Sequence, residues 1–313
     1  MKKTYLITGG TGFIGSNIAN MLIKQGQKVI VFDNNSRGKV SRIFLKNKNL
    51  IFIQGDIREK LSLKKAFKKK INTIIHLAYI NGTKYFYQKP DQILDIATKG
   101  LINIYDLAIK FRVKEIFLAS SSEVYHTPKK IPTLENESLK IPDIFNPRYS
   151  YGGGKILTEL YAANFGRKFF KRTIIFRPHN VYGADMGNEH VIPEFIKRFK
   201  YLKSKKQFKL QGSGNEKRSF IHIDDFCQAF DKILKKGKNL NIYNIGTTEI
   251  VKIRKIVFLL QKIFKKKVDI KHTPLRSGST KKRCPNIDKL KKLGFKQKIS
   301  LYEGLKMIIR NEK

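Results

Sequence analysis

The sequence lacks the features of a disulfide-linked, secreted or membrane-embedded protein. Its 313 residues include only two cysteines, Cys227 and Cys284, which argues against a disulfide framework and a cysteine-based zinc site. No segment approaches the roughly 20 apolar residues that a membrane helix requires. The first apolar stretch ends at Gly9 and Gly10, too soon for the hydrophobic region of a secretory signal. We therefore expect a cytoplasmic protein without a membrane partner.

Acidic residues are also scarce: 24 Asp and Glu stand against 65 Lys and Arg, giving a net charge of +41. A field of this size attracts polyanions such as nucleic acid, an anionic membrane or a phosphorylated substrate. The basic residues are mostly lysines spread along the whole chain, whereas nucleic-acid modules more often cluster them on one element with interleaved aromatics. The pattern therefore favours a compositional origin, typical of an AT-rich genome, and we expect no nucleic-acid partner.

The residues that are present describe a globular α/β protein. Hydrophobic residues make up 41% of the chain, enough for a core in one large or two joined domains. Short β-branched or aromatic runs predict buried parallel strands at Thr4–Thr8, Val29–Phe32, Leu50–Ile53, Thr73–Leu77, Glu115–Ala119 and Thr173–Phe176. Helical segments are predicted between them at Phe13–Lys24, Leu61–Lys69, Pro90–Phe111 and Tyr151–Phe165. This alternation predicts a doubly wound parallel sheet of the Rossmann type.

The pattern becomes irregular after Pro178. Short strands are predicted near Phe208–Leu210, Phe220–Ile223 and Asn241–Ile245, and helices near Ile192–Lys203, Asp224–Lys235 and Lys252–Phe264. We expect residues 1–177 to form the Rossmann domain, with contributions returning from about 220–246. Residues 178–313 are then a smaller mixed α/β lobe that binds substrate. The proline-punctuated stretch Tyr125–Ser150 is long enough to indicate a functional lid.

A glycine-rich turn follows the first strand and opens the first helix. In Thr8–Gly15 (TGGTGFIG), Gly9 permits a tight turn, Gly12 lets a pyrophosphate approach the backbone, and Gly15 allows close helix–strand packing. The helix N-terminus would then hold the phosphates. Asp33, at the end of the second strand, is placed to accept hydrogen bonds from ribose hydroxyls and to repel a 2′-phosphate. The set predicts NAD rather than NADP as cofactor, although the nearby Arg37 weakens that preference.

Three further pairs of residues complete the predicted cofactor site. Asp56 and Ile57 close the third strand, where they suit contact with the adenine. Phe13 and Ile14 lie in the first helical turn beside the phosphates, and Leu77 and Ala78 follow the fourth strand.

The chain resembles the extended short-chain dehydrogenases/reductases of the NAD-dependent epimerase/dehydratase family, which act on nucleotide sugars. The resemblance covers nearly the whole length and rests on seven segments in family order. They are Thr8–Gly15, His76–Ala78 (HLA), Ser121–Tyr125 (SSEVY), Tyr151–Lys155 (YGGGK), Arg177–Gly183 (RPHNVYG), Arg218–Asp225 (RSFIHIDD) and Leu275–Gly278 (LRSG). One departure is Ala97, where many relatives have an asparagine.

Tyr151 and Lys155 stand four residues apart, hence on one face of a helix. A phenol with its usual pKa near 10 is a poor base at neutral pH, and a neighbouring ammonium favours the phenolate. The resemblance implies that Tyr151 is the catalytic tyrosine and that Lys155 also binds the nicotinamide ribose. The three glycines between them are unusual, because each costs about 1 kcal/mol relative to alanine inside a helix.

The resemblance also implies roles for the segment after the fifth strand. Ser121 takes the place of the Ser/Thr that hydrogen-bonds the sugar hydroxyl being oxidised, with Ser122 beside the substrate. Glu123, at the end of a strand, is a candidate general base, as in members that abstract a proton from carbon. Dehydratases of the family place an acidic residue immediately before it, where this chain has Ser122.

Substrate contacts are implied for four positions in the second half of the chain. Asn180, Arg218 and Arg276 resemble the residues that bind the nucleotide diphosphate, for which an arginine fork is suited, and Val191 lies in the segment lining the nucleotide site. The histidines show no metal-ligand spacing with acidic residues, and we expect no metal.

The sequence leaves several reactions open. The leading prediction is 4-epimerisation of a nucleotide-diphosphate sugar through a transient keto-sugar. The alternatives are dehydration or C3/C5 epimerisation with Glu123 as base, net oxidation at C4, and a non-catalytic NAD-binding or RNA-associated protein. Relatives are often homodimers through paired helices, here Pro90–Phe111 and Tyr151–Phe165, and we expect the same.

Overall fold

The computed structural model describes residues 2–187, 189–202, 206–274, 278 and 280–311. The chain divides into two units, each made of three separate segments of the sequence. Unit 1 comprises Met1–Val124, Ile141–Arg177 and Ile233–Tyr243, and unit 2 comprises Tyr125–Lys140, Pro178–Lys232 and Asn244–Lys313. The proline-punctuated stretch between the fifth strand and the following helix is therefore shared by both units.

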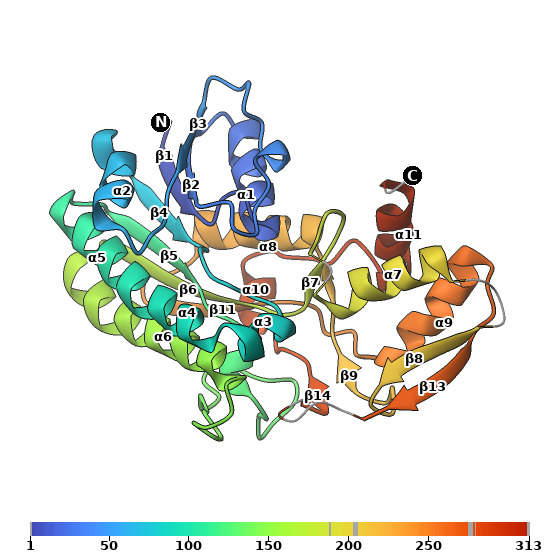
Figure 1. Cartoon of the computed structure of the whole chain (residues 1–313). Coiled ribbons are helices and arrows are strands. Elements are labelled where there is room, and N and C mark those ends of the chain that lie inside the picture. Colours follow the sequence, from blue (N-terminus) through green and yellow to red (C-terminus); the bar gives the residue numbers. More distant parts are fainter. Residues whose placement is uncertain (1, 188, 203–205, 275–277, 279, 312–313) are drawn as a thin grey trace. The chain divides into compact units, whose positions relative to one another are not determined.

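Unit 1 is built on a seven-stranded sheet with the order β11-β6-β5-β4-β1-β2-β3 (Figure 1). Its strands are β1 (Thr4–Thr8), β2 (Lys28–Asp33), β3 (Leu50–Gln54), β4 (Thr73–His76), β5 (Glu115–Ala119), β6 (Arg172–Pro178) and β11 (Asn241–Ile245). Every neighbouring pair from β3 to β6 is parallel. The order 3-2-1-4-5-6 is that of the doubly wound nucleotide-binding fold. The predicted α/β Rossmann fold is confirmed.

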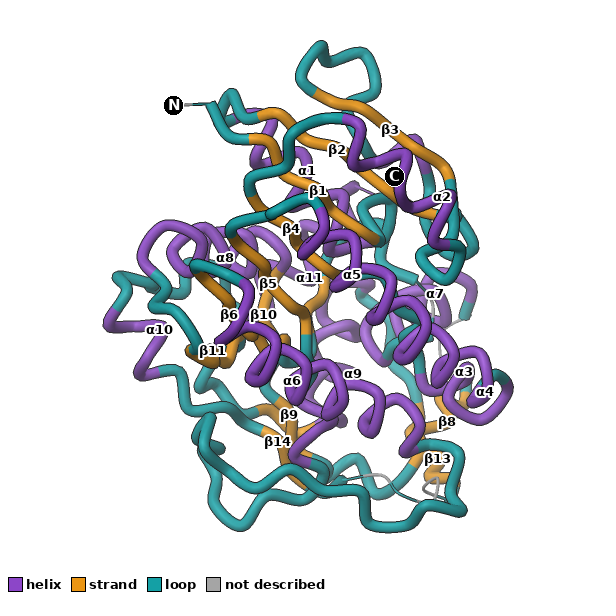
Figure 2. Tube along the Cα trace, turned by 90° about the vertical axis from the view of Figure 1, so that its left-hand side faces the viewer, coloured by secondary structure: helices purple, strands orange, loops and turns teal. Residues whose placement is uncertain are grey.

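The helices of unit 1 are α1 (Phe13–Lys24), α2 (Lys60–Lys64), α3 (Thr83–Gln88), α4 (Pro90–Asp95), α5 (Leu101–Lys110) and α6 (Tyr149–Phe169). The predicted helix Pro90–Phe111 is wrong in detail, because a π-helical turn, η3 (Ile96–Gly100), separates α4 from α5. The helix predicted from Tyr151 begins two residues earlier and ends four residues later. Helices α5 and α6 run side by side (Figure 2), and the rings of Tyr105 and Tyr161 meet between them with centroids 5.4 Å apart.

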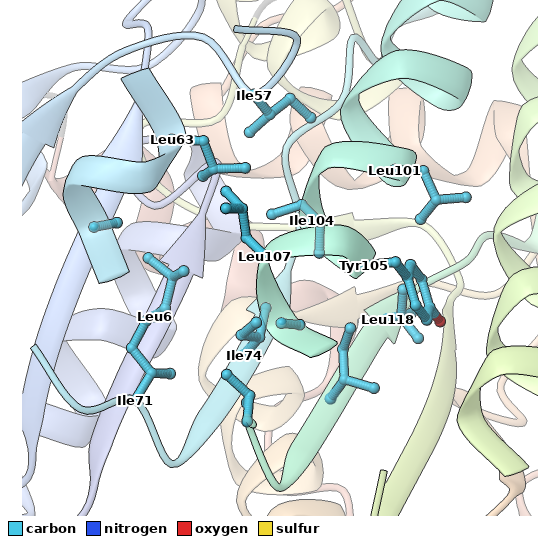
Figure 3. Close-up of a cluster of buried hydrophobic side chains, with 14 of the residues drawn as sticks. Leu6, Ile57, Leu63, Ile71, Ile74, Leu101, Ile104, Tyr105, Leu107 and Leu118 are labelled. Carbon is cyan, nitrogen blue, oxygen red and sulfur yellow. The ribbon is translucent and has the colours of Figure 1, made fainter. Parts of the chain in front are cut away.

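The core of unit 1 lies between the sheet and these helices. Figure 3 shows its strand side chains, including Leu6, Ile74 and Leu118, facing side chains of α5 such as Ile104 and Leu107. All five are at most 2% exposed, and burying one such aliphatic side chain contributes about 1.5–3 kcal/mol. The strands are therefore fixed by hydrophobic burial, which places their carboxyl ends, where the site residues lie.

Unit 2 has its own core and several short pairings. Its helices are α7 (Val191–Tyr201), α8 (Ile223–Lys236, which continues into unit 1), α9 (Ile253–Phe264), α10 (Asp288–Lys292) and α11 (Leu301–Asn311). Its strands are β7 (Val181–Tyr182), β8 (Gln207–Gln211), β9 (Lys217–Arg218), β10 (Ile221–His222), β12 (Val251–Lys252), β13 (Asp269–Thr273) and β14 (Lys282–Arg283). Side chains of α7, α9 and α11 pack together with Phe208 and Leu210 of β8.

The sequence patterns are least accurate in unit 2. The strand predicted at Phe220–Ile223 is only the two-residue β10, because α8 already begins at Ile223. Strand β13 was not predicted, since its sequence DIKHT has no apolar run; its parallel pairing with β8 stabilises it. Within the described ranges, no helix is long and apolar enough to cross a membrane.

Candidate active site

The glycine turn between β1 and α1 closes tightly on itself. Gly9 has a φ of +71°, and a Cβ there would lie 2.7 Å from the Ala78 backbone. A Cβ on Gly15 would overlap the Gly9 carbonyl oxygen and lie 2.8 Å from the Gly10 Cα. Gly12 caps α1 without any side-chain hydrogen bond, and a Cβ there would lie 3.2 Å from the Gly9 carbonyl oxygen. The structure thus gives each of the three predicted glycines a steric reason, and the start of α1 is a helix N-terminus of the kind suited to phosphate.

Asp33 ends β2 directly beside this turn. Its carboxylate accepts hydrogen bonds from the backbone amides of Thr11 (3.0 Å) and Asn35 (2.9 Å). A carboxylate offers about four acceptor positions, so these two bonds fix its orientation and leave capacity for two ribose hydroxyls. The guanidinium of Arg37 bonds the Asn81 carbonyl oxygen and lies 4.8 Å from the centroid of the Tyr85 ring. Arg37 is therefore engaged elsewhere, which supports the preference for NAD.

Asp56 and Ile57, predicted at the adenine, have structural partners as well. The Asp56 carboxylate accepts hydrogen bonds from the Arg58 guanidinium and a 2.9 Å hydrogen bond from Asn34. These bonds, chiefly those from Arg58, lower the pKa of Asp56 to about 2. The Ile57 side chain is buried in the core (Figure 3), where it would collide with a Cβ at Gly100.

Phe13 and Ile14 form the first turn of α1, and Leu77 and Ala78 follow β4. The Leu77 amide bonds the Thr8 carbonyl oxygen at 3.0 Å, and Ala78 lies against Gly9. The predicted cofactor segments of unit 1 thus meet at the carboxyl ends of β1, β2 and β4, the edge at which doubly wound sheets bind nucleotides.

Tyr151 and Lys155 lie in the first two turns of α6, and both are buried. The Lys155 Nζ is 5.8 Å from the centroid of the Tyr151 ring and donates a 2.8 Å hydrogen bond to the Ala119 carbonyl oxygen at the end of β5. Tyr151 stacks on Phe86 with ring centroids 4.7 Å apart. The phenol and the ammonium are therefore held on one helix face by packing on both sides.

Burial controls the charge of Lys155. It lowers the pKa of the ammonium from 10.5 to about 7, and the carboxylate of Glu159, one turn later on α6, opposes the shift. Glu159 is itself buried and is bound by Arg177 on β6, with an Nε–Oε1 distance of 2.7 Å, and by the Ser120 hydroxyl. Because this pKa lies near neutrality, small changes in the surroundings of Lys155 alter the fraction of the side chain that is protonated.

The glycines between the two residues have different environments. A Cβ on Gly152 would find its nearest neighbour, the Glu123 carbonyl oxygen, at an ordinary 3.5 Å. A Cβ on Gly154 would collide with the Tyr79 hydroxyl and lie 2.7 Å from the Ala97 Cβ. Only Gly154 of this pair is therefore required by close packing.

Ser121, Ser122 and Glu123 lie at the end of β5, where a 3₁₀ turn, η4 (Ser122–Tyr125), begins. The Ser121 hydroxyl accepts a 3.2 Å hydrogen bond from the Glu123 amide. The Glu123 carboxylate forms an ion pair with Arg148, with an Nη2–Oε1 distance of 3.7 Å. Since Arg148 is only 8% exposed, a carboxylate partner offsets the cost of burying its charge.

The predicted substrate residues of unit 2 are held by backbone contacts. The Asn180 side chain donates a 2.8 Å hydrogen bond to the Ser219 carbonyl oxygen. Arg218 in β9 donates to the carbonyl oxygens of Lys217 and Thr280 at 2.9 and 2.7 Å. Val191 is the first residue of α7. The remaining prediction, Arg276, lies outside the described residues.

Three residues near Tyr151 and Lys155 were not identified from the sequence: Tyr79, Arg148 and Glu159. Glu159 carried a signal, because it follows Lys155 by four residues and so shares its helix face. Tyr79 follows the HLA segment directly, and its ring lies beside Lys155. Nothing in the sequence pairs Arg148 with Glu123. In the part of the chain that is described, no group of three or more His, Cys, Asp or Glu side chains could hold a metal ion.

A sequence profile of the NAD dependent epimerase/dehydratase family matches residues 5–246 of this chain. The chain belongs to that family. The match contains the glycine turn, Asp33 and the Tyr151–Lys155 pair, so the residues fit the cofactor that the family uses. NAD as cofactor, and an enzyme of the nucleotide-sugar epimerase/dehydratase class, are thereby confirmed.

Known relatives cover nearly the whole chain. A putative UDP-glucose 4-epimerase of Methanocaldococcus jannaschii is 31% identical, over 97% of this chain and 96% of that protein. A UDP-N-acetyl-alpha-D-glucosaminuronate decarboxylase of Bacillus cytotoxicus is 30% identical, over 99% and 98%. The crystal structure of a UDP-glucose 4-epimerase from Thermotoga maritima with UDP-glucose superposes with a TM-score of 0.88 at 29% identity, covering 98% of this chain and 97% of the other. The relatives therefore share a reaction class but not one reaction.

Proposed function

We propose that this protein is a UDP-sugar 4-epimerase. The observation that carries the proposal is the arrangement at the start of α6: the Lys155 ammonium is buried beside Tyr151, while the nearby carboxylate of Glu123 is paired with Arg148. The Tyr151 phenol beside the Lys155 ammonium supplies a base for a sugar hydroxyl. The Glu123 carboxylate, which a reaction at carbon would use as base, is paired with Arg148. The 4-epimerases among the relatives match this chain over almost its full length.

The proposed roles rest on the resemblance to the family, and the placement of the residues supports them. Tyr151 removes the proton of the C4 hydroxyl, Lys155 stabilises the phenolate, and Ser121 orients the hydroxyl. Bound NAD⁺ would supply a reversible hydride acceptor for C4, so that the sugar would pass through a 4-keto form without net oxidation. The amides at the start of α1 would hold the pyrophosphate, and Asp33 would hold the adenosine ribose. Asn180, Val191, Arg218, Arg276 and Ser122 are proposed to bind the nucleotide sugar.

The second candidate is a reaction at carbon, either dehydration or C3/C5 epimerisation, with Glu123 as base. The relatives favour it as well, since a dTDP-D-glucose 4,6-dehydratase of Dictyostelium discoideum is 32% identical over 77% of this chain. In this reaction Glu123 would take up a proton while Arg148 lies beside its carboxylate, and the neutral acid would no longer offset the charge of the buried Arg148. This cost makes 4-epimerisation the better-supported reaction.

Solvent isotope distinguishes the two candidates. The enzyme is incubated in deuterated water with UDP-glucose, UDP-galactose and their N-acetylated and uronic acid forms, and the products are followed by NMR. We expect the C4 epimer with no deuterium on any carbon, because the hydrogen leaves and returns at C4. Deuterium on C3 or C5, or a product that has lost water, would support the second candidate. Stoichiometric NADH accumulation would instead indicate net oxidation.

Tyr151→Phe tests the assigned base. The substitution retains the ring that stacks on Phe86 and removes the hydroxyl, so folding and NAD binding are expected to remain. General base catalysis typically contributes 10²–10⁴-fold, and we expect turnover to fall by about that factor. Turnover near that of the unmodified enzyme would refute the role of Tyr151.

We also propose that the protein is a homodimer through α4, α5 and α6. These helices carry several partly exposed large apolar side chains: Leu94, Ile102, Leu160, Phe165 and Phe169. Leu160→Glu places a charge among them and is expected to yield monomers in light scattering. Phe258→Glu, at a similarly exposed residue of α9, serves as the control. A monomeric unmodified enzyme would contradict the proposal.

A further inference from the structure

The ring of Tyr79 packs against both residues of the proposed catalytic pair. Tyr79 follows β4 by three residues, and the Lys155 Nζ lies 3.8 Å from its ring centroid. The same ring forms a T-shaped contact with Tyr151, with centroids 5.3 Å apart and an interplanar angle of 88°. Both arrangements are attractive, because an aromatic face is negative and an aromatic edge is positive. A single side chain thus contacts both members of the pair.

The space for this ring depends on two small residues. The Tyr79 hydroxyl lies where a Cβ of Gly154 would be, and the Ala97 Cβ would lie 2.7 Å from that Cβ. Alanine or any larger residue at position 154 would displace the hydroxyl. The glycine next to Lys155, which is unfavourable in a helix interior, is therefore explained by the position of Tyr79.

The ring, and not the hydroxyl, accounts for the contacts of Tyr79. The hydroxyl oxygen is buried and has no hydrogen-bond partner among the residues that the structure describes. Burial raises the pKa of this phenol well above 10, so it remains neutral at any physiological pH. Tyr79 is therefore not a competing base. What it offers is an aromatic face to Lys155 and a T-shaped ring contact to Tyr151.

We propose that Tyr79 is a positioning residue for the reaction: its ring fixes the Lys155 ammonium beside the Tyr151 phenol. The proposal rests on the proposed function, since it assumes that Tyr151 and Lys155 act as the catalytic pair. It adds a third residue, the aromatic Tyr79, to that pair and assigns the adjoining Gly154 and Ala97 the role of making room for its ring.

The surroundings of Lys155 set the expected pH dependence. The titratable groups that interact with it come from three segments: His76 at the end of β4, Tyr79 after that strand, and Tyr151 and Glu159 on α6. His76 is neutral, because burial lowers its pKa to about 3. The Glu159 carboxylate favours the ammonium and is retained in every Tyr79 variant. Loss of the Tyr79 ring should therefore lower the pKa of Lys155, by about one unit for a desolvated cation–π contact.

The test compares Tyr79→Leu, which removes the ring, with Tyr79→Phe, which retains it. The measurements are kcat and KM for sugar turnover as functions of pH, with NAD binding by calorimetry on each variant. We expect Tyr79→Leu to lower kcat about tenfold at neutral pH, to move the alkaline limb of the profile about one unit down, and to leave KM within about twofold. Tyr79→Phe should restore the unmodified profile. An unchanged profile in Tyr79→Leu, or equal defects in both variants, would overturn the proposal.

Phe86→Leu is the matched control for packing. Phe86 belongs to the same aromatic group and stacks on Tyr151. Its replacement should lower the unfolding midpoint about as much as Tyr79→Leu and leave the alkaline limb in place. A limb that moves equally in Phe86→Leu would show that loosened packing alone explains the effect, and would also overturn the proposal.

A stability measurement separates this proposal from the reaction. Tyr79→Leu and Lys155→Met are combined in a double-mutant cycle, followed by urea unfolding. A contact between ring and ammonium predicts that the double variant loses less stability than the two single variants together. Strict additivity would contradict the contact even if epimerase activity were found. If the two substitutions are not additive but the protein epimerises no sugar, the contact between Tyr79 and Lys155 is supported and only the proposed function is refuted.

Discussion

Replacement of Glu159 by glutamine probes the charge network beneath the proposed site. Glu159 and Arg177 are 5% and 1% exposed, and Arg177 donates to both carboxylate oxygens. Glutamine has nearly the same shape but no charge, so the substitution removes the carboxylate charge that lies beside the buried Arg177 guanidinium. Two charge-assisted hydrogen bonds contribute about 1.5–3 kcal/mol each, and breaking a buried pair costs about 3–5 kcal/mol. We expect Glu159→Gln to lower the free energy of unfolding by that amount.

The assay is urea unfolding followed by far-ultraviolet circular dichroism, because the chain contains no tryptophan. The matched control is Asp106→Asn, which breaks the ion pair between Asp106 and Lys60. The side chains of Asp106 and Lys60 are 46% and 52% exposed. Exposed pairs contribute about 0–1 kcal/mol. A loss in Glu159→Gln no larger than in Asp106→Asn would refute the reasoning. Replacing both partners, as in Glu159→Leu with Arg177→Met, should recover part of the loss.

Two further outcomes follow from the described contacts. Gly15→Ala should reduce the NAD affinity measured by calorimetry and destabilise the fold by about 1–3 kcal/mol, since its Cβ would overlap the Gly9 carbonyl oxygen. The control is Gly152→Ala, whose Cβ would have its nearest neighbour at 3.5 Å. Equal NAD affinity in the two variants would contradict the role of Gly15. Burial and the Lys155 charge lower the pKa of His76 from 6.5 to about 3. Between these two pH values the unfolded chain binds one more proton than the folded chain. The free energy of unfolding therefore falls as the pH decreases through this range, by up to about 1.4 kcal/mol per pH unit. His76→Gln should flatten the dependence of the urea midpoint between pH 6.5 and 3, and an unaltered slope would show that His76 is not the cause.

Sequence patterns predicted the elements that depend on local chemistry. The strands of the sheet are short apolar runs, and the turn at Gly9–Gly15 follows from glycines at fixed spacing. Tyr151 and Lys155 were paired correctly on one helix face because helical periodicity sets that relation. Predictions failed where pairing supplies the stability: the polar strand β13 forms only because β8 lies beside it. The π-helical turn η3 likewise interrupts what the sequence presents as one continuous helix.

The sequence by itself determined the doubly wound sheet, the NAD turn and the identity of the proposed base, because each is encoded within one strand, one loop or one helix face. The tertiary structure alone decided the charges and partners at the site. It paired Glu123 with Arg148, placed Glu159 against Arg177, and set the Tyr79 ring against Lys155 in the space left by Gly154. These contacts join residues that are 18 to 76 positions apart in the chain. Their energies arise from burial and from the direction of each side chain, which no local pattern specifies.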